Sequence, residues 1–137
     1  MEELLKLKRR RVLVLGIGGG GDVASAYLVY SWLKLLKARP VLGGVVWERF
    51  PVDPVPGPIA LRELRPVEPL MKGLGWASIN TVAERQGRLV KPQIARVARL
   101  VGRRALALDL WLGPAELARE LASLAAEQEL DAVVGVD

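Results

Sequence analysis

A run of glycines followed by an aspartate is the part of this sequence whose residue types point most directly to chemistry. Gly18 to Gly21 are four consecutive glycines, and Asp22 follows them. Glycine has no Cβ, so such a loop turns sharply and lets a ligand come close to its backbone N–H groups. A helix that begins directly after the loop adds unpaired N–H groups and a partial positive charge. The stretch therefore predicts a site for a phosphate or a nucleotide.

The glycines satisfy the pattern G-x-G-x-x-G over residues 16–21, between an expected strand and an expected helix. That context is typical of dinucleotide-binding folds, in which an acidic residue at the end of the second strand binds the ribose. Glu48 stands near this position, and NAD is the cofactor that the interpretation predicts. The loop residues expected to bind the cofactor are Gly16, Gly18, Gly19, Gly20 and Gly21.

Two other phosphate-binding loops have a similar glycine spacing. The P-loop places Lys and Ser or Thr where this sequence has Asp22 and Val23, and an aspartate there would repel a triphosphate unless a metal ion intervened. The segment 18–23 (GGGGDV) resembles instead the S-G-G-x-D-S loop of the ATP-pyrophosphatase (PP-loop) family. Two glycines and the aspartate match, and both serines are replaced. That resemblance implies ATP, Mg²⁺ and adenylation of a substrate, and the dinucleotide interpretation stays open beside it.

Four carboxylates stand at or just past the ends of expected strands. In an open parallel sheet these ends share one edge, where ligands bind. Mg²⁺ takes oxygen ligands and keeps several waters, so carboxylates at this edge can hold the ion against a phosphate. Polar residues at strand ends also serve as plain helix caps. We expect Asp22 and Asp137 to be metal ligands, and Asp22, Glu48 and Asp109 to take part in cofactor binding.

The composition narrows the chemistry further. The chain has no cysteine and no histidine, which excludes disulfides, thiol nucleophiles, imidazole bases and Cys/His metal sites. A net charge of +5 favours anionic partners. Apolar residues make up 51% of the chain, which suggests a surface that meets another subunit or a missing part of the same chain. An assembly module without catalysis of its own is therefore the alternative function.

Membrane and nucleic-acid binding are not the favoured interpretations. No apolar run approaches the roughly 18 residues of a transmembrane helix, so a cytoplasmic protein is expected. Basic residues recur at helical spacing and could track a nucleic-acid backbone, although a solvated helix face is the favoured interpretation. The basic residues concerned are Arg96, Arg99 and Arg103 in the stripe, with Arg88, Lys91 and Arg104 nearby.

These side chains must be positioned by alternating strands and helices. The order β-α-β, insertion, α-β-α-β predicts one domain over 1–137, a Rossmann-like open sheet, mostly parallel, in three layers with helices on both faces. The expected strands are 12–17, 41–47, 105–111 and 132–136, and the expected helices are 22–39, 92–102 and one from Gly113-Pro114 onward.

An insertion of roughly residues 50 to 91 interrupts the alternation. It holds six of the nine prolines, which exclude a regular helix. Strands are expected at 59–64 and 74–80, and Gln86-Gly87 is expected to form the turn of a hairpin between 81–85 and 88–91. The insertion is thus predicted to be a proline-rich, antiparallel arm.

The chain also resembles the N-terminal part of an archaeal family catalogued only as a domain of unknown function. The residues that carry the resemblance are 12–23 (VLVLGIGGGGDV), 43–58 and 108–137. It implies an archaeal cytoplasmic protein that continues past Asp137 into a second Gly/Asp-rich segment, so half of a composite site would lie outside this sequence. Few Asn, Gln and Met residues with many Arg, Glu and Pro suggest a thermophile. The resemblance implies no reaction.

Overall fold

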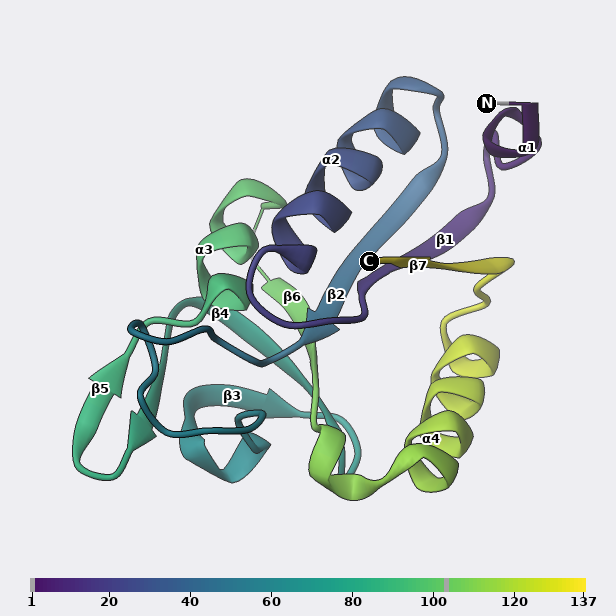
Figure 1. The fold of residues 1–137 in the computed structure, drawn as a ribbon. Helices are drawn as coiled ribbons and strands as arrows, with labels where there is room; N and C mark the ends of the chain where they lie inside the picture. The colour runs from purple at the N-terminus through teal and green to yellow at the C-terminus, as the bar shows by residue number, and fades with distance from the viewer. Residues whose placement is uncertain (1, 103) are drawn as a thin grey trace.

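The computed structural model describes residues 2–102 and 104–137 as an α/β fold (Figure 1). Its seven-stranded sheet has the order β3-β4-β6-β2-β1-β7, and β5 pairs with β4. The strands are β1 (Arg11–Gly16), β2 (Arg39–Val45), β3 (Leu64–Pro69), β4 (Leu74–Arg85), β5 (Arg88–Val90), β6 (Arg104–Leu108) and β7 (Ala132–Val136). The α-helices are α1 (Glu2–Leu5), α2 (Asp22–Leu35), α3 (Gln93–Leu100) and α4 (Pro114–Glu127), and two 3-10 turns span Leu61–Glu63 and Leu110–Leu112.

The sheet is mixed because of one strand. β1 pairs in parallel with β2 and β7, and β2 pairs in parallel with β6. β4 is antiparallel to β3, β5 and β6, so among the described strands it runs against the other six. The predicted mostly parallel α/β sheet with an antiparallel insertion is therefore confirmed. The insertion is part of the same sheet, because β4 pairs directly with β6.

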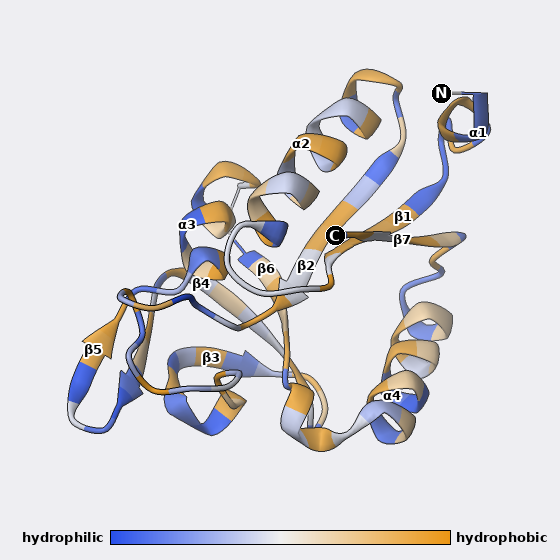
Figure 2. Cartoon of the chain, in the orientation of Figure 1, coloured by the Kyte–Doolittle hydropathy of each residue, from blue (hydrophilic) through white to orange (hydrophobic). Residues whose placement is uncertain are grey.

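Strand β1 is apolar from Val12 to Leu15 because both of its faces are covered there. Val12 and Val14 belong to a cluster with residues of α2 and α3, whereas Leu13 and Leu15 belong to a second cluster with residues of α4. Figure 2 shows hydrophobic (orange) colouring over most of β1 and over the middle of β2. The helices thus lie on opposite faces of the sheet, with α2 and α3 on one face and α4 on the other.

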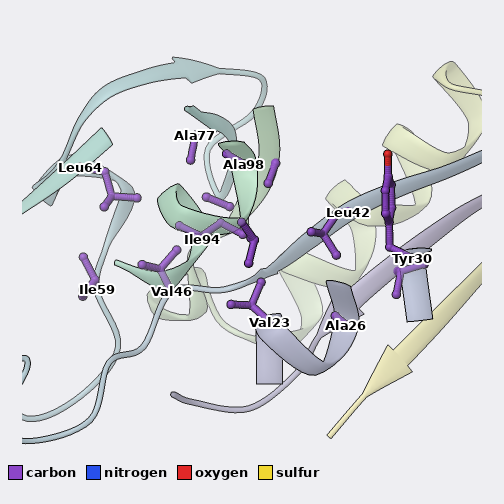
Figure 3. Packing of buried hydrophobic residues seen from close by; sticks show 14 of the residues in the cluster. Val23, Ala26, Tyr30, Leu42, Val46, Ile59, Leu64, Ala77, Ile94 and Ala98 are labelled. Carbon is purple, nitrogen blue, oxygen red and sulfur yellow. The ribbon is translucent and has the colours of Figure 1, made fainter. Parts of the chain in front are cut away.

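The first cluster fixes the start of α2 over the sheet. Val23 and Ala26 of α2 lie against Leu42 of β2 in Figure 3, and Ile94 of α3 extends the same cluster. All four side chains are buried, with at most 4% of their surface exposed. Burial of this kind stabilises the fold by roughly 25 cal/mol per Å² of apolar surface removed from water. The position of the glycine loop is set by this packing.

Helix α2 ends earlier than predicted. The sequence predicted a helix to Arg39 that Pro40 ends, but α2 ends at Leu35 and Lys37 takes a positive φ of 63°. Arg39 and Pro40 already belong to β2, where Pro40 pairs with Val12. Proline fits there because β6 pairs only with residues 43–45 of β2, so no partner needs the missing N–H group.

One predicted strand is wrong and another is too long. The strand predicted at 59–64 is replaced by a 3-10 turn over Leu61–Glu63, where Glu63 Oε2 accepts a hydrogen bond of 2.8 Å from Ala60 N. β6 ends at Leu108 and does not continue to residue 111, because the carboxylate of Asp109 accepts from Trp111 N and begins a second 3-10 turn. The turn predicted at Gln86-Gly87 is confirmed, with positive φ at both residues, and 74–85 form one continuous strand.

The part of the chain that the structure describes contains no helix whose length and apolar character would suit a membrane span.

Candidate functional site

The glycine loop joins the end of β1 to the start of α2. Its backbone is anchored at two points, by Ile17 N donating to Val136 O at 3.0 Å and by Gly20 N donating to Trp47 O at 2.7 Å. Among the described residues, the N–H groups of Gly18, Gly19 and Gly21 have no backbone acceptor. The loop therefore presents several N–H groups beside the N-terminus of α2, as an anion site requires.

At two positions of the loop, sterics explain why the residue is glycine. A Cβ on Gly16 would lie 2.7 Å from Val23 N and 2.8 Å from the carbonyl carbon of Asp22, both backbone atoms. Only glycine lets α2 begin so close to the end of β1. Gly20 has a φ of 67°, a conformation that side chains with a Cβ rarely adopt.

The carboxylates of Asp22 and Asp137 converge over Gly18. A Cβ on Gly18 would lie 2.0 Å from Asp22 Oδ2 and 3.3 Å from Asp137 Oδ1, so both oxygens lie within 3.3 Å of one point. The parallel pairing of β1 with β7, in which Gly16 is opposite Val136, brings the two together. Neither carboxylate forms a salt bridge within the described residues.

Two neighbouring carboxylates without a cationic partner favour a bound cation. Groups of three or more acidic residues that could hold a metal do not occur in 2–102 and 104–137. An ion between Asp22 and Asp137 would therefore complete its shell with water and ligand oxygens. Mg²⁺ binds in this way, through one or two carboxylates together with phosphates. The structure brings the two predicted ligands together, and metal binding itself stays a prediction.

A cleft of about 550 Å³ adjoins the loop. Gly19 lines it together with residues 47–50, and Asp53 and the prolines that follow form the rest of its wall. Arg49 lies over the loop, since a Cβ on Gly20 would be 2.5 Å from Arg49 Nε. Arg49 was not predicted as a site residue, although its place directly after Glu48 at the end of an apolar run was a usable signal.

Glu48 lies in this cleft but is tied to α3. It is 8% exposed, and its Oε1 accepts a hydrogen bond of 2.6 Å from Gln93 N, the first residue of that helix. Burial raises the pKa of Glu48 above its ordinary value. The Gln93 N–H group and the charge of Arg96 act in the opposite direction, and Asp53 adds to the increase. Glu48 therefore caps a helix and also faces the candidate ligand site.

Asp109 has a structural role in the fold. It is 9% exposed, and both carboxylate oxygens are occupied: Oδ1 accepts from Trp111 N at 2.9 Å and Oδ2 from Leu61 N at 3.0 Å. Its carboxylate connects the end of β6 to the insertion. Asp109 is not among the described residues that line the cleft. The structure therefore does not bring it to the glycine loop.

A buried arginine that the sequence analysis missed supports the far wall of the cleft. Arg85 Nε lies 2.8 Å from Asp53 Oδ2, and Arg85 Nη1 lies 2.8 Å from Glu63 Oε2. Its Nη2 donates to the carbonyls of Val55 and Gly57. One sequence signal points to the burial of Arg85. It follows the inward-facing residues 81 and 83 of β4 at a spacing of two, so its side chain points to the same face of the strand.

The predicted basic stripe is only partly described. Arg96 and Arg99 are exposed on α3, as a solvated helix face requires, and Arg103 lies outside the described residues. Arg104 belongs to β6, where its guanidinium lies over the Trp76 ring, 4.3 Å from the ring centre. Nothing in this arrangement favours a nucleic-acid backbone over solvent.

Comparison with known proteins places the chain in a family. The family described as "Protein of unknown function (DUF1152)" matches residues 13–137, and the chain belongs to it. No curated protein and no solved structure matches the chain. The archaeal origin and the cytoplasmic location expected from the sequence stay predictions. The function must therefore be argued from the geometry of the site.

Proposed function

We propose that this member of the DUF1152 family binds a nucleotide or a related phosphorylated ligand at its glycine loop, with Mg²⁺ between Asp22 and Asp137. The observation that carries the proposal is the convergence of these two carboxylates over Gly18, beside loop N–H groups that have no backbone acceptor. We treat the sheet as part of a Rossmann-like three-layer fold, in which ligands bind outside the carboxyl ends of neighbouring parallel strands. β1 and β7 are those strands here.

The two kinds of group would act on the same phosphate. The N–H groups of Gly18, Gly19 and Gly21 and the N-terminus of α2 would hold its oxygens. Asp22 and Asp137 would repel a bare phosphate, so a divalent cation is needed to bridge them. This favours a metal-bound ligand such as ATP over NAD, whose pyrophosphate is commonly bound by N–H groups alone.

The proposal is tested by ligand-induced stabilisation. We expect ATP with Mg²⁺ to raise the melting temperature, because a ligand at 100 times its Kd adds about 2.7 kcal/mol to the free energy of unfolding. AMP and NAD, each with and without Mg²⁺, complete the panel. Asp22→Asn and Asp137→Asn should each abolish the Mg²⁺-dependent part of the shift. Glu127→Gln, the same type of change at an exposed residue of α4, should not.

A panel in which no nucleotide shifts the melting temperature, with or without Mg²⁺, contradicts the proposal. If Asp22→Asn and Asp137→Asn leave the shift intact, the nucleotide site stands but Mg²⁺ is not bound by these two aspartates. The melting temperatures of the variants without ligand must be compared first, since removing one of two neighbouring carboxylates also relieves their repulsion.

A second candidate function is assembly, and a specific surface favours it. α2 exposes Leu28 (68%), Trp32 (48%) and Leu35 (78%). Val136 of the adjacent edge strand β7 lines the same groove as these residues. A groove of about 550 Å³ lies between these elements, and Figure 2 shows hydrophobic residues along both of them. Within the described sheet β7 pairs on one side only, with β1. An apolar edge beside an apolar helix face is typical of an interaction surface.

We infer that this surface packs against a second copy of the chain or against a further segment of a longer protein. Light scattering after size-exclusion chromatography tests the first case. A dimer that Leu28→Glu or Leu35→Glu converts to a monomer supports it, because a charge there would be buried without a partner. A clean monomer for the unmodified chain contradicts self-association.

A further inference from the structure

The cleft and the glycine loop form one continuous surface. Gly19 lines the cleft, and a Cβ on Gly19 would lie 3.4 Å from Trp47 Cγ. The carbonyl of the same tryptophan accepts the N–H of Gly20 at 2.7 Å. A ligand whose phosphate lies on the loop can therefore place the rest of its atoms next to Trp47.

The walls of the cleft are flat and apolar where they are open to solvent. Trp47 is 40% exposed and Phe50 is 79% exposed, and Pro54 and Pro56 continue the wall. Aromatic rings left open to water at the mouth of a pocket bind planar rings well, through stacking and burial of apolar surface. An aliphatic or purely sugar ligand would use this surface poorly.

Polar groups in the cleft fit the other parts of a nucleoside phosphate. Oε1 of Glu48 is occupied by Gln93 N, whereas Oε2 has no described donor and is open to solvent. It can accept from a ribose hydroxyl or from an amino group of a base. Arg49, which makes no salt bridge within the described residues, places its guanidinium over Gly20 on the phosphate side.

We propose that the cleft is a nucleoside-binding subsite. The base lies against Trp47 and Phe50, Glu48 accepts a hydrogen bond from the nucleoside, and Arg49 lies beside the phosphate. The ligand class is therefore a nucleoside phosphate, to the exclusion of inorganic phosphate and simple sugar phosphates. This inference rests on the proposed function, because it uses the glycine loop as the phosphate site.

The experiment compares ligands that differ only in the base. Titration calorimetry of the full chain with Mg²⁺ measures the Kd of AMP, GMP and ribose 5-phosphate. We expect at least one of the two nucleotides to bind about tenfold more tightly than ribose 5-phosphate, which is the size of effect that stacking of one base supplies. Phe50→Ala should remove most of this preference and leave the Kd of ribose 5-phosphate unchanged.

Variants separate stacking from folding. Trp47→Ala should act like Phe50→Ala, although Trp47 also packs on the loop and its loss can unfold the site. Phe50 is so exposed that its substitution should leave the melting temperature unchanged. Trp32→Ala is the matched control, because Trp32 is 48% exposed on α2, away from the cleft. It should leave all three dissociation constants unchanged.

The outcomes distinguish the nucleoside subsite in the cleft from the phosphate site at the loop. Equal affinities for both nucleotides and ribose 5-phosphate overturn the nucleoside subsite and leave a phosphate site at the loop. No binding of any of the three ligands overturns the subsite, and the ATP panel described above then decides the proposed function separately. A preference for the base that survives both Phe50→Ala and Trp47→Ala places the base elsewhere and also overturns this inference.

Discussion

Arg85 and Asp53 form an ion pair in the interior of the protein, with 2.8 Å between Nε and Oδ2 and side-chain exposures of 4% and 0%. Arg85 also binds Glu63, so one guanidinium holds two carboxylates of the insertion. Removing the arginine would leave Asp53 as a buried charge without its partner. The wall of the cleft thus depends on a single side chain of β4.

We predict that Arg85→Met lowers the free energy of unfolding by about 3–5 kcal/mol, the usual cost of breaking a buried ion pair from one side. Urea denaturation followed by circular dichroism measures this. Arg119→Met is the matched control, because Arg119 pairs with Glu116 at the exposed surface of α4, where such pairs contribute roughly 0–1 kcal/mol. Equal losses in the two variants would show that the Arg85 pair has no special role.

We predict that Gly16→Ala destabilises the fold by roughly 1–3 kcal/mol, as overpacking in a tight site does. The added Cβ would meet backbone atoms of Asp22 and Val23 within 2.8 Å, and backbone cannot move aside as a flexible side chain can. Gly135→Ala is the comparison, since its Cβ would meet only the Ile17 side chain at an ordinary 3.4 Å. Thermal unfolding of both variants measures the difference, and a stable Gly16→Ala protein would rule out this packing.

We predict that Gly18→Ala weakens metal and nucleotide binding whereas Gly21→Ala does not. A Cβ on Gly18 would displace the carboxylate of Asp22, but a Cβ on Gly21 meets nothing within 4 Å. Gly21 also has helical φ and ψ, so alanine there should stabilise the folded state by about 0.4–1 kcal/mol. Calorimetric titration with Mg²⁺ and ATP checks both variants. Loss of binding in Gly21→Ala alone would reverse the assignment of the site.

We predict that Glu48 makes the protein less stable as the pH rises. Burial raises its folded-state pKa above the ordinary 4.5, so between these two values the folded protein binds the proton more tightly than the unfolded chain. The cost of burying the charge is absent below 4.5 and complete above the folded-state pKa. Glu48→Gln removes this cost while its amide oxygen can still accept from Gln93 N.

The measurement for Glu48 is the free energy of unfolding from pH 4 to pH 8. Relative to the unmodified protein, Glu48→Gln should gain stability as the pH rises through the raised pKa. Glu127→Gln, at an exposed position, should show no such trend. A Glu48→Gln protein that loses stability as the pH rises would mean that the carboxylate is stabilised by its surroundings.

Most of the fold could be predicted because its signals are local. The apolar run 12–16 could only be a strand covered on both faces, and Pro114 marks the first residue of α4. The errors concern residues whose conformation depends on distant contacts. Lys37 turns the chain two residues before the predicted helix end, and residues 59–64 follow the hydrogen bonds of Glu63 and Asp109.

The candidate site divides in the same way. The glycine loop is visible in the sequence because glycine itself is the signal, and Asp137 could be placed beside it because neighbouring parallel strands end at one edge. Arg49 and Arg85 were not assigned to the site, since their sequence signals are weak and their contacts depend on how the insertion passes the loop. Asp109 was expected at the site, but its carboxylate accepts a hydrogen bond from a backbone N–H group of that insertion.

The pairing of β7 with β1 also sets the time at which the proposed metal site can exist. Asp22 is synthesised early, but Asp137 reaches the loop only when β7, the last of the described strands in chain order, has joined the sheet. A nascent chain that lacks β7 would have one carboxylate and no ion. Bound Mg²⁺ would in turn hold an edge strand in place, so hydrogen exchange of residues 132–136 should slow when metal and nucleotide are added. Occupancy of the site would then report that β7 has joined the sheet.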